Sequence, residues 1–180
     1  MNKNVHNKGM SFMIRWRYFP NCTKIPEHLQ GVITVFENNE NQITSDSHQH
    51  KSDGVLAILT KDFIQCGFLV EQSKAKDDLI RVPVLYGENG KESLSFEVDA
   101  YNADTKTVVE VEAGRGYTNY QFLKDFFECC MMQDVDYFCV AIRKDYRGHK
   151  DFDSVCNFFT AMYASQRMIL PLKGILVIGY

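Results

Sequence analysis

Two short segments near the middle of the chain alternate between apolar and acidic residues, and this alternation restricts the fold more than any other feature of the sequence. The segments are 96–100 and 109–113. Their acidic positions are Glu97, Asp99, Glu110 and Glu112. Because successive side chains of a β-strand point to opposite faces, a period of two residues predicts a strand with one apolar face and one acidic face. Both segments are therefore predicted to be strands.

The connection between these strands, residues 102–106, is short enough to make them an antiparallel hairpin. The apolar faces of the two strands coincide only if the residue numbers of each opposed pair add up to an odd number. A turn centred within the connection then sets Asp99 opposite Glu110. The same register sets Glu97 opposite Glu112. Opposed side chains stand about 4.5 to 5.5 Å apart at Cβ, so four carboxylates are expected to share one small area of the sheet.

Opposed like charges destabilise a sheet unless protons, cations or full solvation relieve the repulsion. A divalent cation is the economical explanation. Hard cations such as Mg²⁺ take oxygen ligands, and a pair of carboxylates with a backbone carbonyl and water suits one. The alternative is a hairpin that turns a charged face to water, as antiparallel sheets commonly do. No lysine or arginine alternates with the acids within either segment, which favours the metal site.

The periodicity of the remaining chain predicts the fold class. Apolar residues recur at helical spacing in 25–43 and again after Ser52 or Asp53, either of which can cap a second helix. The other predicted elements are strands at 79–86, 94–101, 107–113, 137–142 and 175–178, and helices at 118–132 and 153–168. This order, with the first three strands as an antiparallel meander, describes an α/β fold in which helices flank both faces of a mixed central β-sheet.

The composition indicates one soluble domain. With 180 residues, 45% of them hydrophobic, the chain can bury one core, and we expect a single domain over 1–180. No apolar run approaches membrane-spanning length and Met1–Gly9 lacks the apolar stretch of a secretory signal, so we expect a cytoplasmic protein that does not interact with membranes. The six cysteines form no CxxC pair and are expected to be reduced. The net charge of −3 argues against a protein that coats nucleic acid, although the acids of a metal site contribute to it.

An acid on one strand, a short turn and an acid-x-acid triplet on the next strand resemble the core of the PD-(D/E)XK nucleases, the restriction endonuclease-like superfamily. Asp99 matches the first acid and Glu110-Val111-Glu112 matches the triplet. Val98 stands in place of the motif's proline. Glu112 stands in place of its lysine, which is similar to the BamHI-type variant, whose substituted acid is still catalytic. The resemblance covers about residues 52–146.

This resemblance implies roles for the acidic residues. Asp99, Glu110 and the backbone carbonyl of Val111 would hold Mg²⁺ or Mn²⁺, which polarises the scissile phosphate and acidifies the attacking water. Glu112 would accept the proton of that water or bind a second metal ion. Glu71 is similar to the glutamate that follows the helix before the family's core, and it would complete the metal site.

Basic and polar residues beyond the acidic strands are candidates for substrate binding. The resemblance extends to the segment that carries Arg115 and Asn119, and Arg115 can reach a phosphate from the loop that opens the next helix. A basic cluster after the fourth predicted strand can hold a nucleic-acid backbone, and its members include Arg143, Lys144 and Arg147. The basic run 15–17 offers the same chemistry. Each of these groups can instead be an ordinary solvated surface charge.

The leading hypothesis is a metal-dependent DNA endonuclease of a restriction system or a mobile element. If it cuts both strands of a duplex, one site per chain favours a homodimer. The missing lysine and the negative net charge permit a second hypothesis, a nuclease fold that has lost catalysis and serves binding or regulation. A glycoside hydrolase also uses two acids, but a single tryptophan offers no obvious aromatic platform for a sugar.

Overall fold

The computed structural model describes residues 14–114, 117 and 120–180. Its strands are β1 (Arg15–Phe19), β2 (Leu69–Val70), β3 (Ile80–Tyr86), β4 (Glu92–Val98), β5 (Ala100–Asn102), β6 (Thr107–Glu112), β7 (Tyr137–Ile142) and β8 (Gly174–Gly179). Its helices are α1 (Glu27–Asn38), α2 (Glu40–Ile43), α3 (Ser52–Gln65), α4 (Gln121–Met131) and α5 (Asp151–Ser165). Within these described residues, no helix is both long enough and apolar enough to cross a membrane.

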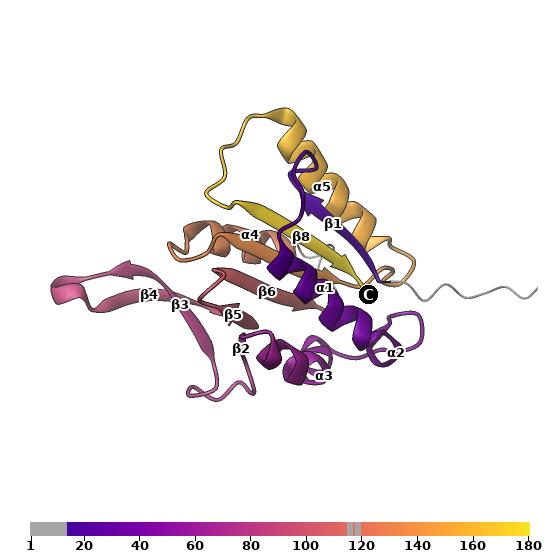
Figure 1. Ribbon diagram of the computed structural model, residues 1–180, viewed down its shortest axis with the longest axis horizontal. Helices are drawn as coiled ribbons and strands as arrows, with labels where there is room; N and C mark the ends of the chain where they lie inside the picture. The colour runs from indigo at the N-terminus through magenta and orange to yellow at the C-terminus, as the bar shows by residue number, and fades with distance from the viewer. Residues whose placement is uncertain (1–13, 115–116, 118–119) are drawn as a thin grey trace, which may run out of the picture.

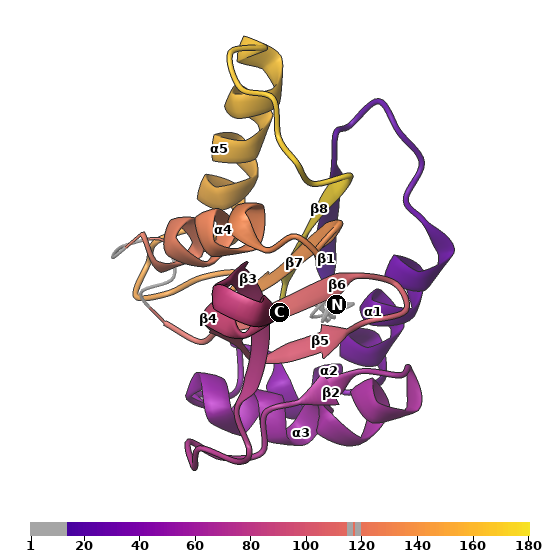
Figure 2. The same cartoon turned by 90° about the vertical axis from the view of Figure 1, so that its left-hand side faces the viewer.

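Six of the strands form one mixed sheet in the order β1-β8-β7-β6-β5-β2. The middle strands β6, β7 and β8 are parallel, while β1, β5 and β2 pair antiparallel with their neighbours. One face of the sheet packs against α1, α2 and α3, and the other face packs against α4 and α5 (Figures 1 and 2). The predicted α/β fold, with a mixed sheet flanked by helices, is confirmed.

The strands of the sheet differ in how their side chains are buried. β7 and β8 are apolar along almost their whole length, as expected for parallel strands that helices cover on both faces. β6 alternates instead. Val109 and Val111 pack into the core beside α1 and α3, whereas Glu110 and Glu112 point to the side of α4. The predicted division of this strand into an apolar face and an acidic face is therefore confirmed.

The predicted strand 94–101 is divided between two sheets, so the predicted three-strand meander is wrong. β4 pairs with β3 in a separate two-stranded sheet that projects from the body of the molecule (Figure 1). β5 pairs with β6 in the register that the apolar pattern predicted, with Ala100 opposite Val109. This is the last pair between β5 and β6, and Asp99 and Glu110 are the residues next to it on the two strands.

Glu97 is not opposite Glu112 as predicted. It pairs with Arg81 of β3, and 3.1 Å separates Arg81 Nη2 from Glu97 Oε1. The break between β4 and β5 falls at Asp99, whose carbonyl oxygen accepts a hydrogen bond from the backbone nitrogen of Glu71 at 2.9 Å. This backbone bond, and a hydrogen bond of the Asp99 side chain described below, both attach residue 99 to the main sheet. The chain therefore leaves the main sheet on the amino-terminal side of Asp99.

Two short strands and one helix break were not predicted. The basic run 15–17 lies in the edge strand β1, where Arg15 forms an ion pair of 2.7 Å with Asp153 of α5. β2 consists of two residues, too few for a visible alternation. The predicted helix 25–43 is divided into α1 and α2 at the buried Asn39, whose side-chain nitrogen donates to the carbonyl of Val35 at 2.9 Å.

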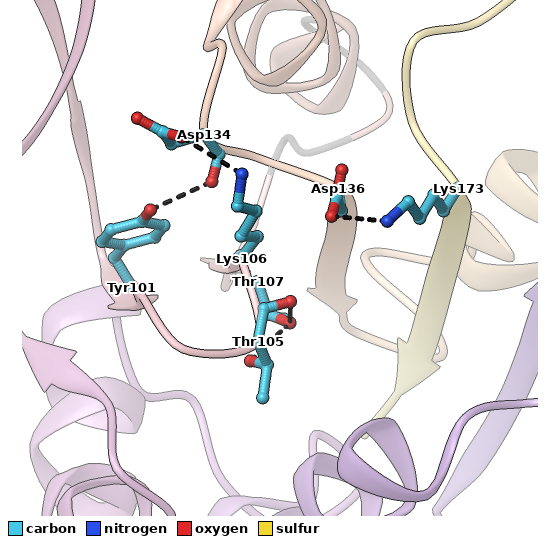
Figure 3. Close-up of polar contacts among 7 residues, drawn as sticks. All are labelled: Tyr101, Thr105, Lys106, Thr107, Asp134, Asp136 and Lys173. Carbon is cyan, nitrogen blue, oxygen red and sulfur yellow. Dashed lines mark hydrogen bonds and ion pairs between the residues drawn. The ribbon is translucent and has the colours of Figure 1, made fainter.

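Polar contacts fasten the amino-terminal ends of the parallel strands (Figure 3). Lys106 Nζ lies 3.2 Å from Asp134 Oδ1, and the hydroxyl of Tyr101 donates to the carbonyl of Asp134 at 3.0 Å. Lys173 Nζ lies 2.9 Å from Asp136 Oδ2. Since exposed ion pairs contribute little free energy, their effect is to order the loops at this end of the sheet. The carboxyl ends of the strands, where open α/β sheets bind their ligands, lie at the opposite end.

Candidate active site

Seven carboxyl groups line one pocket of about 250 Å³ beside the carboxyl end of β6, and four of them come from β6, α4 and the junction of β4 and β5. β6 provides Glu110 and Glu112, the junction of β4 and β5 provides Asp99, and α4 provides Asp125. The other three are Asp53 of α3, Glu71, which follows β2, and Glu97 of β4. The structure thus brings together all four acids that were predicted as site residues, and it adds Asp125. Val111, predicted as a ligand through its carbonyl, also lines the pocket.

Asp99 is held in place by the backbone of β6. Its Oδ2 accepts a hydrogen bond of 2.8 Å from the amide nitrogen of Val111. Burial raises the pKa of the Asp99 carboxyl from 3.8 to about 6, although the Val111 hydrogen bond and Lys74 act in the opposite direction. The nearby carboxyl groups of Glu71 and Asp125 raise this pKa further. Asp99 is therefore both a structural link between strands and a carboxyl group that is costly to ionise.

Glu110 lies at the centre of the group. Burial raises the pKa of its carboxyl well above the ordinary value of 4.5, and the charges of Asp99, Asp125 and Glu112 raise it further, in that order. Within the part of the chain that the structure describes, no lysine or arginine forms an ion pair with Asp99, Glu110 or Glu112. The repulsion among these acids is consequently relieved by protons in the metal-free protein, or by a cation that takes their place.

Glu112 and Asp125 interact directly. Burial, and then the charges of Asp125 and Asp99, raise the pKa of Glu112 to about 8, and a side-chain hydrogen bond to Asp125 acts in the same direction. The same bond lowers the pKa of Asp125, which burial raises to about 6. Asp125 Oδ1 accepts a hydrogen bond of 3.3 Å from Gln121 Nε2, while Asp125 Oδ2 is buried without a hydrogen-bond partner among the described residues.

Two lysines stand at the edge of the pocket. Lys124 Nζ lies 3.1 Å from Glu128 Oε2 and 3.7 Å from Asp125 Oδ1, and its charge lowers the pKa values of Glu110 and Glu112. Lys74 Nζ lies 2.5 Å from the buried carboxyl group of Glu71. Lys124 therefore brings a positive charge from α4 to the edge of the acidic group.

Asp125 and Lys124 were not assigned a role from the sequence, but one signal was available. The buried residues of α4 are Phe122, Asp125, Phe126 and Cys129. These positions form one helical stripe, and Asp125 is its only charged member. A carboxyl group on the buried face of an amphipathic helix is rare unless it is paired or functional, so its position indicated a polar site beneath the helix.

The donor set fits a hard divalent cation. Four carboxyl groups offer only oxygen atoms, which Mg²⁺ and Mn²⁺ prefer, and the unpartnered Asp125 Oδ2 is a buried oxygen that a cation can satisfy. Among residues 14–114, 117 and 120–180, no group of three or more His, Cys, Asp or Glu side chains is already drawn together in a metal-binding arrangement.

The predicted substrate-binding residues occupy a neighbouring region. Arg143 and Arg147 line a second, larger pocket of about 870 Å³, which also lies at the carboxyl ends of the parallel strands. Lys144 forms an ion pair of 3.1 Å with Asp46 instead of lining this pocket. Arg115 and Asn119, the other two predicted residues, lie outside the described residues.

The two pockets meet at the start of α3. Ser52 lines both, and its hydroxyl accepts a hydrogen bond of 3.1 Å from the amide of Ala113, directly after Glu112. Ser52 was predicted as a candidate helix cap, but its hydroxyl makes no capping bond and instead joins α3 to the acidic strand. An acidic pocket and a pocket with basic residues are thus adjacent. The chain matches no family model and no curated protein sequence.

Proposed function

We propose that this protein is a metal-dependent nuclease that hydrolyses phosphodiester bonds in DNA. The observation that carries the proposal is the convergence of Asp99, Glu110, Glu112 and Asp125 on one pocket, without a lysine or arginine bound to the first three among the described residues. Such a group is unfavourable for stability, because buried like charges repel one another. A divalent cation that binds to these acids during function would explain why the protein keeps such a group.

Asp99 and Glu110 are the proposed metal ligands, together with the carbonyl oxygen of Val111. Bound Mg²⁺ or Mn²⁺ supplies Lewis acidity toward a phosphate oxygen and lowers the pKa of a bound water. The hydrogen bond between Val111 and Asp99 orients one ligand relative to the other, as outer contacts commonly do in metal sites. Glu71 lies beside these acids and binds Lys74, so it is placed to complete the site or to orient water.

Glu112 and Asp125 form the proposed proton-accepting pair. A water oxygen attacks the phosphorus, one ester bond of the phosphate breaks, the proton of the water passes to whichever of the two carboxyl groups is ionised, and the departing alkoxide takes up a proton from solvent. Their proximity supports this role, because a pair with separated pKa values can hold one proton and accept another near neutral pH. Lys124, beside the pair, offsets negative charge on the phosphate.

The likeness to the PD-(D/E)XK core supports the choice of a phosphodiester substrate. The order of a helix, an acid at a strand end and an acid-x-acid triplet on the neighbouring strand is the arrangement that the resemblance implies. The neighbouring basic residues Arg143 and Arg147 favour a substrate with phosphate groups. We accordingly propose a restriction endonuclease-like fold and DNA as the partner.

A cleavage assay tests the proposal. Purified protein is incubated with supercoiled plasmid and with single-stranded DNA in Mg²⁺, in Mn²⁺ and in chelator. We expect cleavage in either metal and none in chelator. Asp99→Asn and Glu110→Gln should lower the rate at least about 100-fold, as expected for loss of a group on which metal catalysis depends. Glu88→Gln, on the exposed turn of the β3–β4 hairpin, is the matched control and should cleave normally.

The same assay distinguishes this proposal from an inactive nuclease fold that serves binding or regulation. That second function is favoured by one observation: Glu112, in the position of the motif lysine, is engaged with Asp125. Metal-dependent cleavage that persists in both Asp99→Asn and Glu110→Gln would refute the site assignment. Binding of DNA by all variants with cleavage by none, including the unaltered protein, would establish the inactive module instead.

A further inference from the structure

The larger pocket, of about 870 Å³, is a groove that leads into the acidic site. It lies between the loop that precedes α3 and the loop that follows β7, and Ser52 and Ala113 connect it with the end of β6. The proposed nuclease chemistry uses none of the side chains inside this groove directly. Its position makes it the natural path for the part of a substrate next to the bond that is cut.

The charges of the groove favour an anionic ligand. Lys51, Arg143 and Arg147 line it, and the two acids that also line it are engaged elsewhere. Asp46 forms an ion pair with Lys144, and Asp145 accepts a hydrogen bond of 2.9 Å from the backbone of Gly148. Arg143 is fixed by donating to the carbonyl of His50, and its Nε is buried without a partner among the described residues. The lining therefore carries three positive and two negative side chains, and the ion pair with Lys144 offsets the charge of Asp46.

Tyr146 gives the groove an aromatic surface close to the acidic strand. Its ring lies against Gly114, where a Cβ atom would come within 3.0 Å of the ring. The guanidinium carbons of Arg143 and Arg147 lie 5.7 Å and 5.3 Å from the centre of the ring. Cations over an aromatic face stabilise such an arrangement. Tyr146 and Arg147 thus form one cation–aromatic unit beside Gly114, which follows Glu112 by two residues in the chain.

Arg147 adopts a backbone conformation that its residue type disfavours. Tyr146 and His149 exchange two backbone hydrogen bonds of 2.9 and 3.0 Å, and the residues between them, Arg147 and Gly148, have φ of 53° and 82°. Two successive positive φ values define a type I′ turn, in which Asn and Gly are preferred. The turn itself gives no reason for arginine at this position. A function for its guanidinium group does, because backbone strain of this kind concentrates at functional sites.

We propose that this groove binds an unpaired nucleotide strand that continues into the acidic site. A base stacks on the unit formed by Tyr146 and Arg147, and the adjoining phosphates lie against Lys51 and Arg143. The inference rests on the proposed nuclease function and names its substrate as DNA with a single-stranded segment at the cut. Stacking platforms act on unpaired bases, because the bases of a duplex already have their faces covered by neighbouring pairs.

Binding in chelator tests the groove separately from cleavage. The probes are a single-stranded oligonucleotide of about 12 bases that carries the fluorescent base 2-aminopurine, and the same oligonucleotide annealed as a blunt duplex. We expect tighter binding of the single strand, with quenching of 2-aminopurine by stacking. Tyr146→Phe should keep both effects, whereas Tyr146→Leu, which also fills the space against Gly114, should lose the quenching and bind about tenfold more weakly.

Arg147→Asn is the most informative variant, because its thermal stability and its affinity for the single strand should change in opposite directions. Asparagine suits the left-handed turn, so the thermal midpoint should stay the same or rise. Loss of the guanidinium group should weaken binding of the single strand about fivefold or more. A merely structural role for Arg147 predicts no loss of affinity in a variant that folds as well as the original protein.

The outcomes distinguish the two proposals. Stacking that depends on Tyr146, in a protein that cleaves no DNA in Mn²⁺, would support the groove and overturn the nuclease. Metal-dependent cleavage together with unchanged binding in both Tyr146→Leu and Arg147→Asn would overturn the groove and leave the nuclease intact. Equal or tighter binding of the blunt duplex would also overturn the groove.

Discussion

Replacing Glu112 by glutamine should stabilise the metal-free protein near neutral pH. The pKa of this carboxyl group rises from 4.5 to about 8 on folding, so the folded state favours the protonated form. The stabilising effect of that proton is fully present below about pH 4.5 and is lost as the pH rises through about 8. Glutamine is neutral throughout and can donate the same hydrogen bond to Asp125. The variant should therefore lack this part of the pH dependence.

The magnitude follows from the two pKa values. Between about pH 5 and pH 7, the carboxyl group of Glu112 ionises in the unfolded chain but stays protonated in the folded protein, and this difference costs about 2 kcal/mol of folding free energy, after a reduction for the opening of the pocket to solvent. For a chain of this length that corresponds to a thermal midpoint about 4 to 8 °C higher in Glu112→Gln at pH 7. At pH 5 the two proteins should differ little.

Thermal unfolding followed by circular dichroism in chelator, at several pH values from 5 to 8, measures this difference. Glu88→Gln on the exposed hairpin turn controls for the loss of one negative charge and should parallel the unaltered protein. Addition of Mn²⁺ should raise the midpoint of the unaltered protein more than that of Glu112→Gln, since a cation replaces the protons. Parallel pH profiles for Glu112→Gln and the unaltered protein, or a lower midpoint for the variant at pH 7, would refute the reasoning.

Three further substitutions test other parts of the structure. Lys124→Gln removes a charge that lowers the pKa of Asp125, which is about 6, so folded Asp125 should keep its proton to higher pH and stability in chelator should fall more steeply from pH 5 to 7, as measured by the same unfolding series. Phe126→Ala leaves a cavity in the core beneath α4 and should cost about 3 to 5 kcal/mol in urea unfolding with an unchanged m-value. Gly174→Ala places a Cβ atom against both the hydroxyl and the ring of Tyr18 and should cost about 1 to 3 kcal/mol in the same urea unfolding.

Local periodicity determined much of this fold. The alternation in 109–113 correctly predicted which side of β6 is apolar and which is acidic. The apolar pattern also predicted the register of Ala100 opposite Val109, because a shift of one residue would exchange the two faces of a strand. β7 was predicted over its full length, since a strand covered on both faces has no polar side to obscure its limits.

Only the tertiary structure decided where the strand containing Asp99 divides and which helix covers the acids. The division depends on bonds from Asp99 to Glu71 and Val111, which are distant in sequence, and no local pattern encodes such contacts. Asp125 and Lys124 join Glu112 because α4 packs on the acidic face of β6. The sequence by itself determined the faces of each element, since side-chain direction follows from backbone period. The meeting of those faces, and with it the composition of the site, required the packing of the whole chain.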